Sequence, residues 1–146
     1  MNQTLSQKRI LHLKQDYERG FIRHCGFKAD QVAHGKFRAS LVLKDHHRQQ
    51  DGFVHAGVMA TMADHTAGYA AFTVVDPTFQ ILSIEFKINF FKPAFGRGLE
   101  CRSTVIRAGR KVIVAESEVY DLGEENRGMT AKAMVTLMAV PGEALV

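Results

Sequence analysis

The sequence has few cysteines and no long uncharged apolar run, and both absences narrow the class of protein. Cys25 and Cys101 are the two cysteines among 146 residues, and they form no Cys-x-x-Cys pair. A zinc site or redox pair is therefore not expected, and two reduced thiols suit a cytoplasmic protein. The first twenty residues are polar and mixed in charge, unlike a secretory signal. The most apolar stretch contains Asp64, so a transmembrane span is not expected.

The charge is mildly basic, with a formal net charge of +4 and no long run of Lys or Arg. Nucleic-acid-binding proteins usually carry a basic run or stripe, so that class is not expected. A small excess of positive charge is typical of an ordinary protein surface, and it would also suit a small ligand that carries phosphate. Hydrophobic residues make up 46% of the chain, which is enough for one core. We expect a single domain over residues 1–146.

The periodicity of apolar residues predicts a helix, two strands, a long buried helix and four strands. The predicted elements lie in residues 1–20, 25–33, 36–43, 56–75, 82–90, 99–107, 111–120 and 129–140. This order predicts an α+β fold in which an antiparallel sheet covers one long helix. Because edges and apolar faces would stay open, we expect at least a homodimer.

One carboxylate, Asp64, lies in the middle of the apolar helix, where burial is costly without partners or a task. On a helical wheel it shares one narrow face with Gly57, Thr61 and Gly68. Glycine costs a helix about 1 kcal/mol relative to alanine, so this stripe indicates close approach of a backbone or a ligand. Alternatively, Asp64 is a structural residue bonded to backbone or to a hydroxyl such as that of Thr61 or Ser83.

The start of the same helix offers hydrogen-bond donors. Backbone N–H groups near Ala56 and Gly57 lack intrahelical acceptors and can polarise a carbonyl oxygen. Asp64 lies roughly 10 Å further along the axis, so one carbonyl cannot reach both within one chain. A site at a dimer interface would bring them together. His55 is either part of this site, a cap or a core residue, and His65 is expected to be structural.

Three histidines near this helix raise the question of a metal. His46 and His47 belong to a polar loop that is expected to be solvated, and His55 follows eight residues later. This spacing matches no standard ligand set, so no metal is expected.

Residues 52–71, GFVHAGVMATMADHTAGYAA, resemble the HGG…D signature of hotdog-fold thioesterases of the phenylacetate-pathway and 4-hydroxybenzoyl-CoA type. Residues 84–121, with KINFFKP followed by RAGRK, resemble the next family stretch. The resemblance implies a hotdog fold, with an antiparallel sheet wrapped around one central helix. It also implies homodimers, or homotetramers, that hydrolyse acyl-CoA thioesters without any cofactor beyond the substrate's own coenzyme A.

The resemblance also implies roles for particular residues. Asp64 would be the general base for water or the nucleophile. The side-chain N–H of Gln49 would hold the thioester carbonyl. The motif reads HAG from His55, so Ala56 stands where the family has the glycine whose N–H polarises the carbonyl, and Gly57 keeps the second glycine.

The family serine that places the attacking water corresponds to Ser83. Strict alternation puts Ser83 on the strand face opposite Ile84 and Phe86, so its access to Asp64 would depend on the dimer interface. Apolar side chains that either line an acyl pocket or belong to the core are Phe86, Phe90, Phe91, Met59 and Met62.

The RAGRK turn contains Arg107, Gly109, Arg110 and Lys111. In the family this turn lies near the nucleotide and phosphates of coenzyme A, and guanidinium groups bind phosphate well. Lys92 is a further candidate for the same contact. A solvated hairpin tip is the alternative.

These expectations describe an acyl-CoA thioesterase for small or medium acyl groups, aromatic ones included. The expected partners are an acyl-CoA and a second copy of the chain, with neither nucleic acid nor membrane. Two alternatives stay open, a non-catalytic acyl-CoA-binding module and a hotdog hydratase or dehydratase.

Overall fold

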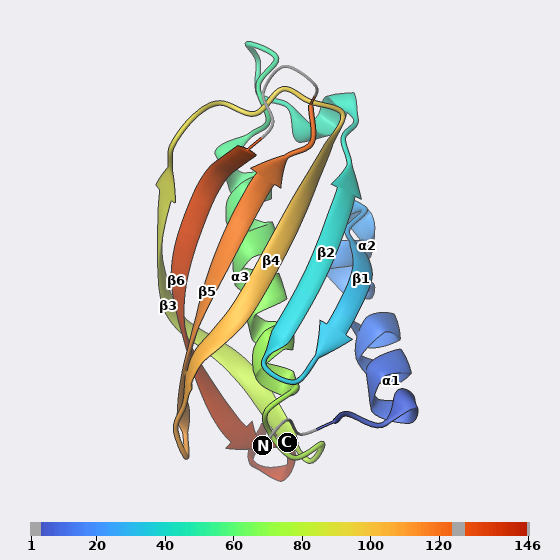
Figure 1. Cartoon of the computed structure of the whole chain (residues 1–146), viewed down its shortest axis with the longest axis vertical. Coiled ribbons are helices and arrows are strands. Elements are labelled where there is room, and N and C mark those ends of the chain that lie inside the picture. The colour runs from blue at the N-terminus through green and yellow to red at the C-terminus, as the bar shows by residue number, and fades with distance from the viewer. Residues whose placement is uncertain (1–3, 124–127, 146) are drawn as a thin grey trace.

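One long helix, α3 (Ala56–Phe72), lies against a six-stranded sheet in the computed structural model, which describes residues 4–123 and 128–145 (Figure 1). All five neighbouring strand pairs are antiparallel, in the order β1-β2-β4-β5-β6-β3. The strands are β1 (Lys28–Ala33), β2 (Lys36–Val42), β3 (Phe79–Phe90), β4 (Gly98–Ala108), β5 (Val112–Asp121) and β6 (Gly128–Pro141). The predicted antiparallel sheet around a central helix is confirmed.

The N-terminal segment forms two helices where one was predicted. Helix α1 (Gln7–Tyr17) begins after Ser6, whose hydroxyl accepts the Arg9 N–H at 3.1 Å. Gly20 follows the end of this helix, and its positive φ of 56° lets the chain turn and begin α2 (Gly20–Cys25). Both helices lie at the β1 edge of the sheet (Figure 1). Two short 3₁₀ helices, Asp45–His47 and Gly142–Leu145, complete the elements.

Small residues let α3 lie close to the sheet. Met62, Ala63 and Ala67 are fully buried against it. The Ser117 hydroxyl of β5 donates to the Ala63 carbonyl at 2.7 Å, which fixes the height of the helix on the sheet. Within the described residues, no helix is both long and apolar enough to cross a lipid bilayer.

One side of α3 is left open. Gly57, Thr61, Asp64 and Gly68 lie along it, as the helical wheel predicts, and each keeps some exposure. A Cβ atom added to Gly68 would meet nothing within 4 Å. Among the residues that the structure describes, therefore, nothing packs on this part of the stripe.

The open side borders β3, which is an edge strand with a break in its alternation. Ser83 and Glu85 pair with consecutive residues of β6, so Ile84 is an extra residue between them. Such a bulge reverses the alternation beyond it. The prediction that Ser83 faces away from Phe86 is therefore wrong, because both side chains lie on the face that α3 covers.

Candidate active site

Asp64 and Ser83 form the centre of the site. The Ser83 Oγ donates to the Asp64 Oδ1 at 2.6 Å, which the bulge at Ile84 makes possible. The other carboxylate oxygen accepts no hydrogen bond from the described residues. A cavity of about 240 Å³ adjoins this pair and is lined by Asp64, His65, Gly68, Tyr69, Phe72, Ile81 and Ser83. The arrangement orients one carboxylate oxygen and leaves the other available to accept a proton or to attack an electrophile.

Sequence reasoning did not single out Tyr69, Phe72 or Ile81 as members of this cavity. Tyr69 and Phe72 follow Asp64 on α3, and Ile81 precedes Ser83 on the same face of β3. Gly68 and Phe72 follow Asp64 at successive intervals of four residues, so helical spacing predicts only a row of residues along α3, and the cavity itself depends on the packing of β3 beside it.

The start of α3 is capped by His55. Its Nδ1 accepts the N–H of Gly57 at 2.8 Å, so the capping role left open for His55 is the one observed. The Gly57 N–H is thus occupied and does not point freely at a ligand. The N–H of Ala56 has no acceptor among the described residues. Of the two expected backbone donors, Ala56 is the one that the structure leaves available.

Gln49 lies in a tight turn just before this helix. Its backbone N–H donates to Phe53 O at 2.8 Å, and its carbonyl accepts from Gly52 N–H at 3.1 Å. Its side-chain Oε1 accepts the N–H of Asp51. The oxygen of the amide is therefore committed to the turn, which leaves the NH2 group to donate elsewhere.

The donors and the carboxylate stay apart within one chain. Asp64 lies eight residues beyond Ala56 on α3, which is about 12 Å at the rise of an α-helix. Gln49 lies before the same end of the helix. The structure brings Asp64 and Ser83 together, and it places Gln49, His55, Ala56 and Gly57 at the other end of the open stripe.

His65 is a structural residue, as expected. Its Nε2 hydrogen-bonds to the Tyr17 carbonyl at 3.0 Å, and its ring packs against Tyr17 and Tyr69. Burial lowers the pKa of His65, in spite of the nearby Asp64 carboxylate. The neutral ring links α3 to α1 beside the candidate site.

His47 does not lie in solvent, and that expectation is wrong. It is 3% exposed, and both ring nitrogens are used. Nδ1 accepts the Lys44 N–H at 2.9 Å, so Nε2 carries the proton and donates to the Cys25 carbonyl at 2.7 Å. Burial lowers the pKa of His47. Within the described residues, no three His, Cys, Asp or Glu side chains come close enough to hold a metal ion.

The RAGRK turn joins β4 and β5 and gathers its basic residues around a surface hollow. The hollow measures about 360 Å³ and is lined by Arg107, Gly109, Arg110, Lys111, Val112 and Val114. The Gly109 N–H donates to Val112 O at 2.9 Å, and a Cβ atom on Gly109 would lie 2.6 Å from that oxygen. The tight turn therefore requires glycine at this position.

Lys92 is not part of this group. It follows β3, whose residue Phe90 pairs with Ala131 of β6, whereas Val112 beside the turn pairs with Met138. Ala131 and Met138 are seven residues apart on β6, which corresponds to about 23 Å along the strand. Within one chain, Lys92 and the RAGRK turn therefore cannot contact the same phosphate.

The apolar candidates divide into two groups. Met59 and Met62 are 3% and 0% exposed and belong to the core. Phe86, Phe90 and Phe91 are 41%, 44% and 58% exposed along the open edge. The phenylalanines therefore remain available to contact a ligand or another chain.

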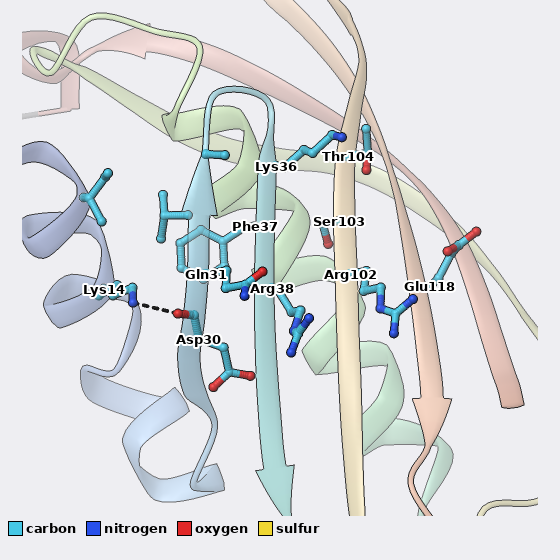
Figure 2. Close-up of a pocket in the computed structure, with 13 residues that line it drawn as sticks. Lys14, Asp30, Gln31, Lys36, Phe37, Arg38, Arg102, Ser103, Thr104 and Glu118 are labelled. Carbon is cyan, nitrogen blue, oxygen red and sulfur yellow. Dashed lines mark hydrogen bonds between the residues drawn. The ribbon is translucent and has the colours of Figure 1, made fainter. Parts of the chain in front are cut away.

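A larger groove, of about 770 Å³, lies beside β1, β2 and β4 (Figure 2). In that view, the guanidinium groups of Arg38 and Arg102 lie side by side. Both pair with Glu100, at 3.2 Å and 2.5 Å. None of the candidate site residues named from the sequence lines this groove.

Comparison with known proteins places this chain in a family. The Thioesterase superfamily profile matches residues 51–126. A candidate esterase of Saccharolobus solfataricus is 32% identical over 94 residues, which cover 64% of this chain and 66% of that protein. A thioesterase family protein from Silicibacter pomeroyi is 30% identical, with a TM-score of 0.86 over 90% of this chain and 98% of that one.

A thioesterase of Haemophilus influenzae shares the fold at 18% identity, with a TM-score of 0.82 over 97% of this chain and 94% of that one. The profile match covers more than half of the chain and includes His55, Asp64 and Ser83. The chain belongs to the Thioesterase superfamily and has the α+β hotdog fold.

Proposed function

We propose that this protein is an acyl-CoA thioesterase of the phenylacetate-pathway and 4-hydroxybenzoyl-CoA type. It hydrolyses small or medium acyl-CoA esters, aromatic ones included, to the free acid and coenzyme A. The observation that carries the proposal is the Asp64–Ser83 pair, which stands beside a cavity on the open side of α3. Binding alone does not require an oriented carboxylate at that place.

The proposed mechanism uses groups of the chain and no separate cofactor. Asp64 either takes a proton from water, which attacks the thioester carbon, or attacks that carbon itself. Ser83 holds the Asp64 Oδ1 and leaves Oδ2 free to act. The Ala56 N–H and the Gln49 NH2 stabilise the charge that develops on the carbonyl oxygen. The carbon–sulfur bond then breaks. In the general-base route, the coenzyme A sulfur takes up the proton that Asp64 removed from water; in the nucleophilic route, a mixed anhydride with Asp64 forms, and water then hydrolyses it and supplies the proton to the sulfur.

A homodimer would complete the site. Strand β3 is a terminal strand of the sheet, and Leu82 and Ile84 on it are 46% and 53% exposed. A long apolar edge strand usually has a partner. If two copies pair antiparallel near the middle of β3, the Phe90 end of one strand lies beside the Ile81 end of the other. The partner's carbonyl-binding end would then approach Asp64.

The coenzyme A moiety would use the RAGRK turn. Arg107, Arg110 and Lys111 surround the hollow there, and guanidinium groups bind phosphate with paired hydrogen bonds. Replacing both arginines with glutamine should raise KM for acyl-CoA about tenfold or more with little change in kcat, since each hydrogen bond to a charged group is worth about 1.5–3 kcal/mol. An unchanged KM would leave the turn as a solvated hairpin tip.

The activity is tested by thiol release from a panel of acyl-CoA esters that vary in chain length and aromaticity. Asp64→Asn keeps the shape of the side chain and should lower kcat by at least a hundredfold without unfolding the protein. Near-normal turnover by this variant would remove Asp64 from the chemistry. Binding without hydrolysis by the wild type would indicate an acyl-CoA-binding module. A change in enoyl-CoA absorbance would indicate a hydratase.

The dimer site is tested by mixing two inactive variants. If Asp64 and Gln49 of one site come from different subunits, a heterodimer of Asp64→Asn and Gln49→Ala chains has one intact site. Random mixing should then restore about a quarter of the wild-type activity, since half of the dimers are mixed and half of their sites are intact. No recovery after subunit exchange would place both residues of a site on one chain.

A further inference from the structure

A buried carboxylate outside the proposed chemistry holds two loops together. Asp121 ends β5 and is 1% exposed. Its Oδ2 accepts the N–H groups of Phe95 and Gly96, at 3.0 Å and 3.3 Å, and its Oδ1 accepts the N–H of Gly123 at 2.9 Å. A buried carboxylate with three backbone donors is well compensated, so it costs the fold little. Asp121 thereby fixes the segment that follows Pro93.

Residue 96 of this segment packs so closely against Asp121 that there is no space for a side chain. A Cβ atom on Gly96 would overlap the Asp121 carboxylate and would lie 2.5 Å from the Gly123 nitrogen. The backbone of Gly96 must therefore approach the carboxylate directly. The position of residues 94–96 depends on this contact.

Residues 94–96 in turn hold the turn that carries Gln49. Arg48 Nη2 donates to the Gly96 carbonyl at 2.9 Å, and Arg48 Nη1 donates to the Gly52 carbonyl at 3.1 Å. The Val54 N–H donates to Ala94 O at 2.8 Å. One guanidinium group thus clamps both sides of the Gln49 turn to a segment that Asp121 fixes.

We propose that Asp121 and Arg48 are positioning residues, which act in sequence to hold the Gln49 amide where it donates to the thioester carbonyl. The inference rests on the proposed thioesterase function and extends it to residues that touch neither substrate nor reacting atoms. Its physical basis is that catalytic donors must be held closely, because misplacement by about 1 Å can cost about a hundredfold in rate.

Arg48→Met tests the second contact, because methionine keeps much of the apolar stem and removes every guanidinium donor. We expect kcat to fall about 10- to 100-fold, within the loss that misplacement of about 1 Å produces. KM should change less than threefold, because the coenzyme A contacts are untouched. Arg48→Lys retains one donor and should recover part of the rate. Arg97→Met is the control, because it removes an exposed charge of the same sign from the next segment.

A double-mutant cycle separates positioning from general destabilisation. In a Gln49→Ala background the amide is absent, so Arg48→Met should lower kcat less than twofold further. Losses that multiply in the double variant would overturn the proposal, as would an Arg48→Met enzyme with wild-type kcat. Asp121→Asn, which replaces one acceptor oxygen with a donor, should show the same dependence on Gln49. If it fails to fold, the Arg48 cycle decides alone.

The proposed activity and the positioning role of Arg48 and Asp121 predict different outcomes. A wild-type protein without thioester hydrolysis overturns the proposed function and this inference together. Hydrolysis by the wild type with additive losses in the cycle overturns the inference alone.

Discussion

The Ser83 hydroxyl and the Asp64 carboxylate are 19 residues apart in sequence and 2.6 Å apart in space. A hydrogen bond to a charged group contributes about 1.5–3 kcal/mol. Asp64 has this one side-chain donor among the described residues, so the orientation of its carboxylate depends on Ser83.

Ser83→Ala should therefore lower kcat for acyl-CoA hydrolysis about 10- to 100-fold, the kinetic equivalent of that hydrogen bond. The measurement is steady-state thiol release. Ser40→Ala is the matched control, because the Ser40 hydroxyl of β2 donates to Asp30 away from the site. Equal losses in both variants would contradict a role specific to Asp64.

Ala56→Gly tests whether a backbone N–H, and not a side chain, serves the carbonyl oxygen. Glycine keeps the N–H and restores the family motif, so kcat should change less than threefold. The helix loses little, since residue 56 is its first residue and not an interior one. A loss of an order of magnitude, measured on the same acyl-CoA, would mean that the methyl group itself contacts the substrate.

Gly68→Leu tests whether something covers the open stripe of α3. A Cβ atom there would meet nothing within 4 Å among the described residues, and leucine favours helix more than glycine does. The chain should therefore keep its fold by circular dichroism. Activity should nevertheless fall at least tenfold, because the leucine would occupy space meant for substrate or partner.

Gln15→Leu adds the same side chain to an exposed position of α1 and should leave activity unchanged. If Gly68→Leu also retains full activity and the wild-type oligomeric state, neither a ligand nor a second chain uses this face.

His47 makes the stability of the fold depend on pH. Burial lowers its pKa, so the unfolded chain takes up a proton at a higher pH than the folded one. The free energy of unfolding is therefore highest above about pH 6.5, the unperturbed pKa of histidine, and decreases as pH falls below it. Protonation would also remove the acceptor for the Lys44 N–H.

Urea unfolding at pH 7.5 and pH 5.5 measures this decrease. His46→Gln, at the exposed neighbour, should retain the wild-type decrease, and His47→Gln should be less stable at pH 7.5 and show a smaller one. The same pH dependence in both variants would assign it to other groups, of which His65 is the first, because burial also lowers its pKa.

Local periodicity was sufficient for the main elements. The alternation of Phe37, Ala39 and Leu41 predicts β2, and the unbroken apolar pattern after His55 predicts α3. Helical spacing also predicts that Asp64 shares a face with Gly57 and Gly68, because that relation depends on the helix alone.

Relations between distant segments could not be predicted in the same way. The bulge at Ile84 is a property of how β3 pairs with β6. The residues around it still alternate in polarity, so the sequence of β3 alone does not reveal the bulge. His47 lies in a polar stretch, and its burial follows from contacts with the Cys25 carbonyl. Asp121 precedes a glycine-containing loop, and nothing local distinguishes it from a solvated turn residue.

The extra residue at position 84 has a consequence for any change in the length of β3. Deleting Ile84 would restore simple two-residue alternation, so residues on one side of the deletion would exchange inward and outward orientations. Either the Ser83 hydroxyl would turn away from α3, or the side chains of Phe86, Ile88 and Phe90 would. The number of residues in β3, as much as the identity of residue 83, therefore determines whether Asp64 has a hydrogen-bond donor.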